Sequence, residues 1–183
     1  ALGVRLSLPS SRRDRDVCGT DLTDCTSRIS PIWQTVRDAA ERYYDRTSAC
    51  TFTTFVAYEH SPAPGGDMMH RNVIFRNANV PAQPISAFEA PGAAELYRGL
   101  SGACNVCGGC EALAIPHNSN QTAGGIFGLA EIAGLDETAA RSFLEARRFY
   151  EPVVELMRHK GSSECRPESV LVPDEECGFE VAR

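Results

Sequence analysis

The chain has 183 residues, of which 43% are hydrophobic, and its formal net charge at pH 7 is −6. This length and apolar content are enough to bury the core of one domain, so the sequence is not that of a tail or a linker. The acidic balance argues against nucleic acid as the main partner, because phosphate binding needs clustered Lys and Arg. No apolar run is long enough for a membrane span.

The sequence contains eight cysteines, an even number that is high for this length. Such a content favours a disulfide framework and therefore an oxidising, extracytoplasmic compartment, periplasmic or secreted. Proximity in the sequence favours two local bridges, Cys18–Cys25 and Cys165–Cys177.

The other four cysteines are harder to pair. Cys50 and Cys110 each precede an expected strand, so their sulfurs would meet if the two strands were parallel neighbours, which leaves Cys104 for Cys107. The spacing of Cys104, Cys107 and Cys110 also suits metal thiolates or a redox pair. It lacks an evident fourth ligand, and we favour disulfides.

In chain order, residues 1–29 are expected to form an irregular, disulfide-containing lead-in, and residues 30–183 to belong to a single α/β domain. The first strongly patterned helix is expected to begin at Ser30 and Pro31, which suit the cap and the first turn, and to end near Tyr44. Its core-facing stripe is expected to comprise Ile32, Val36, Ala39 and Tyr43.

Further strands and helices are expected to alternate after this helix. β-Branched and aromatic residues favour strands over 50–59 and 70–76, separated by a turn rich in Pro and Gly at 61–66. A short helix is expected over 91–100 and a buried strand over 111–118. Asp136 is expected to cap another helix, and 152–159 is a candidate fourth strand. This alternation predicts an α/β fold with a parallel sheet. The core stripe of the second long helix is expected to be Ala139, Phe143, Ala146 and Tyr150.

Three of the expected strands have a candidate ligand at one end: Glu59, His70 and His117. Strand ends are where α/β folds assemble their sites, because the strands hold positions that the loops alone cannot hold. His60 would point to the opposite face from Glu59, and His159 precedes a Lys-Gly turn, so both are interpreted as structural or exposed.

Several runs carry a resemblance to a known family: W-Q-x-x-x-D-A-A-E, F-T-T-F-V-A-Y-E, P-G-G-D-x-x-H-R-N-V-I-F-R, A-I-P-H-N-S-N and H-K-G-S-S-E-C. They resemble the bacterial family known as domain of unknown function 3604, which is grouped with the PHP (polymerase and histidinol phosphatase) metal-dependent hydrolases. The resemblance implies part of a distorted, parallel-stranded βα barrel of PHP type that binds divalent Zn, Mn or Fe at its strand ends. The cysteine content adds the expectation that this barrel is stapled by disulfides.

The resemblance also implies roles for individual residues. Glu59 would be a bridging carboxylate, and His70 and His117 would be imidazole ligands. Asn118 and Glu164 would stand near the ligands as supporting groups. The family's H-x-H and D-x-H motifs do not occur in this sequence, so the chain resembles the central part of the family domain, and it is open whether this part catalyses a reaction by itself.

Two functions from different classes follow. The first is a secreted or periplasmic metal-dependent hydrolase, phosphoesterase-like by analogy, that acts on a small-molecule or phosphoester substrate. The alternative is a non-catalytic, disulfide-stapled subunit that keeps the scaffold for binding or assembly. Because an incomplete sheet exposes an edge strand, this alternative predicts self-association or a second chain that completes the barrel.

Overall fold

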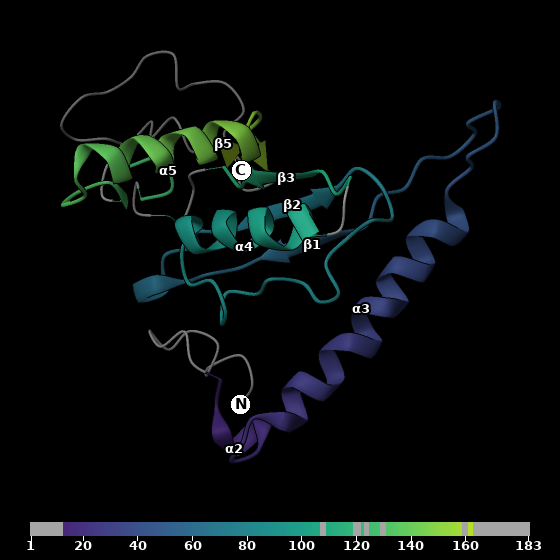
Figure 1. Ribbon diagram of the computed structural model, residues 1–183, viewed down its shortest axis with the longest axis horizontal. Helices are drawn as coiled ribbons and strands as arrows, with labels where there is room; N and C mark the ends of the chain where they lie inside the picture. The colour runs from purple at the N-terminus through teal and green to yellow at the C-terminus, as the bar shows by residue number, and fades with distance from the viewer. Residues whose placement is uncertain are drawn as a thin grey trace.

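The computed structural model describes residues 13–106, 109–118, 122, 125–128, 131–158 and 161–162 (Figure 1). These residues form four α-helices, one 3₁₀ turn and two small sheets. In chain order the elements are α2 (Arg15–Cys18), α3 (Thr23–Tyr43), β1 (Ala57–His60), η1 (Pro64–Gly66), β2 (Arg71–Phe75), α4 (Ala93–Val106), β3 (Ala112–Pro116), α5 (Glu137–Tyr150), β4 (Met157–Arg158) and β5 (Gly161–Ser162).

The central sheet is antiparallel, with the strand order β1-β2-β3. The prediction of a parallel-stranded βα barrel is therefore wrong for the described residues. The physical reason lies in the segment 61–70, which holds only the short turn η1 and joins β1 to β2 as a hairpin. A parallel pair needs a longer crossover, usually through a helix. The connection from β2 to β3 does contain α4, but β3 still runs antiparallel to β2.

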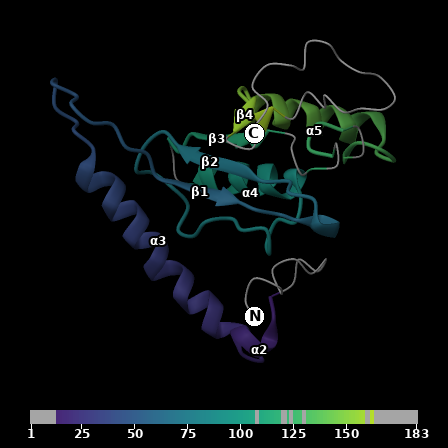
Figure 2. The same cartoon turned by 180° about the vertical axis from the view of Figure 1, so that it is seen from behind.

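The two faces of this sheet differ in burial because side chains alternate along each strand. One face carries Tyr58, Val73, Phe75 and Ala114, which pack in the core with Leu96 of α4. The other face carries half-buried or exposed side chains, and we call it the open face. Seen from behind, β1 and β2 lie in front of α4 (Figure 2). The open-face residues are Ala57, Glu59, Asn72, Ile74, Leu113 and Ile115.

The long helix α3 extends away from the sheet and is anchored by Trp33 (Figure 1). The Trp33 indole packs against Tyr58 and Phe75, and its Nε1–H donates a hydrogen bond to the Pro81 carbonyl at 2.9 Å. The helix begins at Thr23 rather than at Ser30, so Pro31 lies inside it. The expected core stripe is wrong: Ile32 and Tyr43 are 65% and 62% exposed. The large Trp33 ring, together with Ala40, turns a different face of α3 to the core.

The helix α5 agrees with its sequence pattern. Asp136 caps it as expected, since its Oδ1 accepts a hydrogen bond from the Ala139 amide at 2.8 Å. Phe143 and Tyr150 of the expected stripe are buried, and Tyr97 of α4 packs against both rings. The candidate strand over 152–159 is observed only as β4, which pairs with β5 in a separate two-stranded sheet.

Two disulfides are present among the described residues. The bridge Cys18–Cys25 is formed as expected and ties α2 to the first turn of α3. The second bridge is Cys104–Cys110, so the predicted pairs Cys104–Cys107 and Cys50–Cys110 are wrong. The antiparallel sheet removes the parallel edge that would have brought Cys50 to Cys110, and Cys50 is a free, exposed thiol.

The predicted bridge Cys165–Cys177 lies outside the described residues, as do His159 and Glu164. Disulfides are typical of proteins that fold in an oxidising environment. In the described part of the chain, no helix has the length and apolar character needed to cross a membrane.

Candidate metal centre

Glu59, His70 and His117 lie at the same end of the open face. Glu59 is in β1, His70 directly precedes β2, and His117 directly follows β3. The His117 amide donates a hydrogen bond to the His70 carbonyl at 3.1 Å, so these two residues continue the β2–β3 pairing beyond the strand ends. Alternation along the three strands then directs all three side chains to the open face.

The three side chains converge on one oxygen atom. Glu59 Oε1 lies 3.1 Å from His70 Nδ1 and 2.9 Å from His117 Nε2. The two imidazole rings are 5.1 Å apart between centroids and inclined by 62°. One nitrogen of each ring and one carboxylate oxygen all lie within 4.8 Å of one another. The three residues expected at strand ends thus lie together, and their role as metal ligands stays a prediction.

The cluster is accessible from one side. The His117 side chain is 8% exposed and that of His70 is 17% exposed, whereas the Glu59 side chain is 45% exposed. The two imidazole rings therefore line the enclosed side of the cluster, and the Glu59 carboxylate lies on its exposed side. A molecule in solution can reach the shared centre past Glu59.

The donor set fits a divalent transition metal. Two neutral imidazoles and one carboxylate are the protein ligands of several catalytic zinc sites, and the same combination holds iron in non-haem sites. Three ligands leave further positions for water or substrate, which a purely structural site would fill with protein groups. Glu59 Oε1 is hydrogen-bonded to His70 Nδ1 and lies within ion-pair distance of His117 Nε2.

The residues after His117 fix the end of β3. Asn118 is 1% exposed, and its backbone N–H donates a hydrogen bond to Glu155 Oε2 at 3.2 Å. The Glu155 amide in turn donates to the Pro116 carbonyl at 3.1 Å. These bonds tie the segment after α5 to the strand end that carries His117. The supporting role expected of Asn118 remains a prediction.

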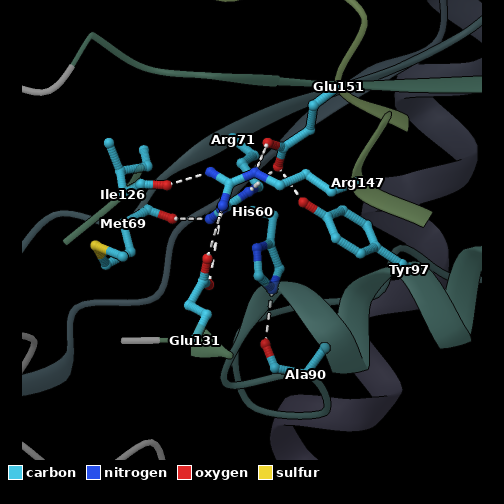
Figure 3. Close-up of polar contacts among 9 residues, drawn as sticks. All are labelled: His60, Met69, Arg71, Ala90, Tyr97, Ile126, Glu131, Arg147 and Glu151. Carbon is cyan, nitrogen blue, oxygen red and sulfur yellow. Dashed lines mark hydrogen bonds and ion pairs between the residues drawn. The ribbon is translucent and has the colours of Figure 1, made fainter. Parts of the chain in front are cut away.

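On the opposite face of the sheet, Arg71 organises a buried cluster of charges that the sequence analysis missed (Figure 3). Its side chain is 0% exposed. Its Nε donates to Glu151 Oε1 at 2.5 Å, and its Nη1 donates to the Met69 carbonyl at 2.9 Å. Since Met69 directly precedes His70, the Arg71 side chain fixes the backbone that leads into the candidate ligand His70.

Further side chains complete this buried cluster around Glu151. The Tyr97 hydroxyl donates to Glu151 Oε1, and Arg147 Nε donates to Glu151 Oε2 at 3.1 Å. Arg147 also binds the carboxylate of Glu131 at 3.2 Å and the carbonyl of Ile126. Figure 3 shows both guanidinium groups directed at the same carboxylates. The buried cluster therefore links β2, α4 and α5.

Burial shifts the pKa values of several side chains in this buried cluster. Desolvation raises the pKa of the Tyr97 phenol above its usual 10.0, and the neighbouring Glu151 charge raises it further. Desolvation also raises the pKa of Glu131, although the charges of Arg71 and Arg147 oppose this shift. For Arg71, desolvation is the largest single influence and acts to lower the pKa, but the contributions of Glu151, Tyr97 and Glu131 together outweigh it and the net pKa is raised.

His60 lies on the same buried face as Arg71, its cross-strand partner. It is 0% exposed, and its ring nitrogen Nε2 lies 2.7 Å from the Ala90 carbonyl, to which an Nε2–H donates (Figure 3). Desolvation lowers the pKa of His60 to about 4, and the charges of Arg71 and His70 contribute to the shift. His60 is thus a neutral structural residue, as its position one residue after Glu59 predicts.

The buried cluster has a signal in the sequence. In the strand run R-N-V-I-F, every second residue faces the core, so Arg71 falls on the same face as Val73 and Phe75. A charged residue in a core-facing position requires a buried partner. The sequence alone does not indicate that this partner is Glu151, which follows the end of α5.

Comparison with protein families places the chain in a family. The family described as "Protein of unknown function (DUF3604)" matches residues 6–183, which is nearly the whole chain. The match supports the family resemblance but not the further relation to PHP hydrolases. Neither a curated protein nor a solved structure matches the sequence.

Proposed function

The chain belongs to the family described as protein of unknown function (DUF3604), and on that premise we propose that it is a metal-dependent hydrolase whose metal is held by Glu59, His70 and His117. One observation carries the proposal: three candidate ligand atoms, one from within β1, one from just before β2 and one from just after β3, lie within 4.8 Å of one another. We further propose that the protein acts in the periplasm or outside the cell, because its disulfides suit an oxidising compartment.

The chemistry follows from the donor set. A bound divalent ion lowers the pKa of its water towards ~7 and polarises the oxygen of a phosphoryl or carbonyl group. His70 and His117 bind through neutral ring nitrogens, and their position against the sheet limits their movement. Glu59, which is the most exposed of the three, would hold the metal as a carboxylate, and the substrate would reach the ion past it.

The proposed substrate is a small ester, with a phosphoester as the first choice. This choice rests on the resemblance to PHP hydrolases and on the preference of hard divalent ions for phosphoryl oxygens. The site opens at Glu59 rather than within an enclosed cavity, so substrates with one exposed ester group suit it.

The test is hydrolysis of p-nitrophenyl phosphate, its phosphodiester counterpart and a p-nitrophenyl carboxylic ester after loading with Zn²⁺, Mn²⁺ or Fe²⁺. We expect turnover that chelators remove and that Glu59→Gln lowers by roughly 10²-fold or more. Glu111→Gln is the matched control, because Glu111 is an exposed acid farther along the open face. Equal turnover of wild type and Glu59→Gln would contradict the proposal.

A second candidate is a binding or assembly subunit. It is favoured by large apolar side chains on the surface, among them Ile32 and Tyr43 of α3 and, in the segment between α3 and β1, Phe52 and Phe55. Sedimentation of the metal-free protein tests this function. A concentration-dependent oligomer that Tyr43→Ser dissociates would support it, and a monomer at all concentrations would contradict it.

A further inference from the structure

Asn72 shares the open face with the three candidate ligands. It is the cross-strand partner of Glu59 on β1 and of Ile115 on β3. It also lies two residues after His70 along β2, so alternation directs its side chain to the same face. Asn72 therefore stands on the central strand, beside the cluster.

The path of the Glu59 side chain places the cluster close to Asn72. Glu59 starts on β1, yet its carboxylate lies 2.9 Å from His117 Nε2 beyond the end of β3. Because β2 is the middle strand, the carboxylate must cross above β2 between the levels of His70 and Asn72. Directly opposed residues have Cβ atoms about 5 Å apart, so the carboxamide of Asn72 is within reach of the same centre.

The Asn72 side chain is not held elsewhere. It is half-buried, and among the described residues its carboxamide has no hydrogen-bond partner. Asn77 shows the contrast, because its Nδ2 donates to the Gly109 carbonyl at 2.8 Å and its Oδ1 accepts from the Asn79 amide at 2.9 Å. Buried polar groups are normally paired, so a half-buried carboxamide beside three candidate ligands suits a role in the site.

We propose that Asn72 is the fourth protein ligand of the metal site and binds through Oδ1. The inference rests on the proposed metal site and extends it from three residues to four. A carboxamide oxygen is a hard, neutral donor that suits divalent ions which also accept imidazole and carboxylate. The fourth ligand adds no charge and leaves the exposed side at Glu59 for water and substrate.

The experiment measures Co²⁺ binding by the full chain, through both the affinity and the visible absorption spectrum of the bound ion. Co²⁺ is the probe because its absorption depends on the number and type of its ligands. We expect Asn72→Leu, which keeps the size but removes the oxygen, to weaken Co²⁺ binding by roughly 10–100-fold and to change the spectrum. Asn72→Asp restores an oxygen donor and should bind Co²⁺ at least as tightly as wild type.

Two controls separate this inference from the proposal on which it rests. Ile74→Ala alters the next open-face position of β2 and should leave both affinity and spectrum unchanged, while His70→Ala should abolish binding. If Asn72→Leu matches wild type in affinity and spectrum while His70→Ala does not bind, Asn72 is no ligand and the three-residue site stands. If wild type does not bind Co²⁺, both proposals fail. Circular dichroism of each variant confirms that it is folded.

Discussion

The two faces of the central sheet use charged residues in opposite ways. On the buried face, Arg71 is fully enclosed, and its guanidinium is bound to Glu151 and to the Met69 carbonyl. On the open face, Glu59 is nearly half exposed and lies between two imidazoles at the edge of the solvent. The same three strands therefore carry a cluster that stabilises the fold and a cluster that is accessible to ligands.

This difference teaches that the face to which a strand residue points, rather than its distance from the strand end, decides the role of a polar residue. Arg71 and His70 are neighbours in the sequence, as are Glu59 and His60, yet within each pair one side chain enters the core and the other faces the site. We therefore expect substitutions on the buried face to change stability, and substitutions on the open face to change metal binding.

The largest expected effect is on the buried face. Glu151→Ala leaves the buried Arg71 without its closest carboxylate, and loss of one partner from a buried ion pair typically costs about 3–5 kcal/mol of unfolding free energy. Glu111→Ala is the matched variant on the open face, where Glu111 pairs with the exposed Arg76 at the other end of β2. Its effect should be small and should shrink with added salt. Urea unfolding measures both, and similar losses in the two variants would contradict the comparison.

Apolar side chains provide a second comparison of the faces. Val73→Ala removes two methyl groups from a fully buried site, so we expect a loss of about 2 kcal/mol in unfolding free energy. Ile74→Ala removes more atoms, but from a half-buried open-face position, and should cost only about 1 kcal/mol. The larger truncation is thus expected to have the smaller effect. The reverse order in urea unfolding would mean that the open face is covered in solution.

A smaller effect is expected in alkaline solution. Burial raises the pKa of Tyr97 and of Tyr58 in the folded state, whereas in the unfolded chain each phenol titrates near 10.0. Above that pH the unfolded state loses protons that the folded state retains, so stability present below pH 10 is lost as the pH rises. We expect Tyr97→Phe to flatten this loss and Tyr43→Phe, at an exposed tyrosine, to leave it unchanged. Equal slopes in all three proteins would contradict burial as the cause.

The candidate site could be predicted from the sequence while the sheet around it could not. Glu59, His70 and His117 each stand at the boundary between a β-branched run and a turn, and such boundaries are local features. Strand direction depends instead on the length and structure of the connection between consecutive strands. The turn rich in Pro and Gly at 61–66 predicts a break between two strands, and the shortness of this connection favours a hairpin over a parallel crossover.

The other differences between the sequence-based expectations and the structure arise from packing between residues that are far apart in the chain. The interaction between Arg71 and Glu151 joins residues far apart in the chain, and only the fold brings them together. On α3, a stripe of apolar residues that includes Tyr43 has the right spacing for a core face, but the Trp33 ring, on another face, occupies the core. Spacing predicted that the helix exists and not which of its faces would be buried.

The most direct test of the account is the metal content of the purified protein after dialysis, measured by elemental analysis for wild type, His70→Ala and His60→Gln. His70 and His60 lie beside the same sheet end but on opposite faces, and Gln can keep the hydrogen bond to Ala90. The account predicts stoichiometric transition metal in wild type and His60→Gln, and none in His70→Ala. Equal metal content in all three proteins, or none in wild type, would contradict a metal site on the open face.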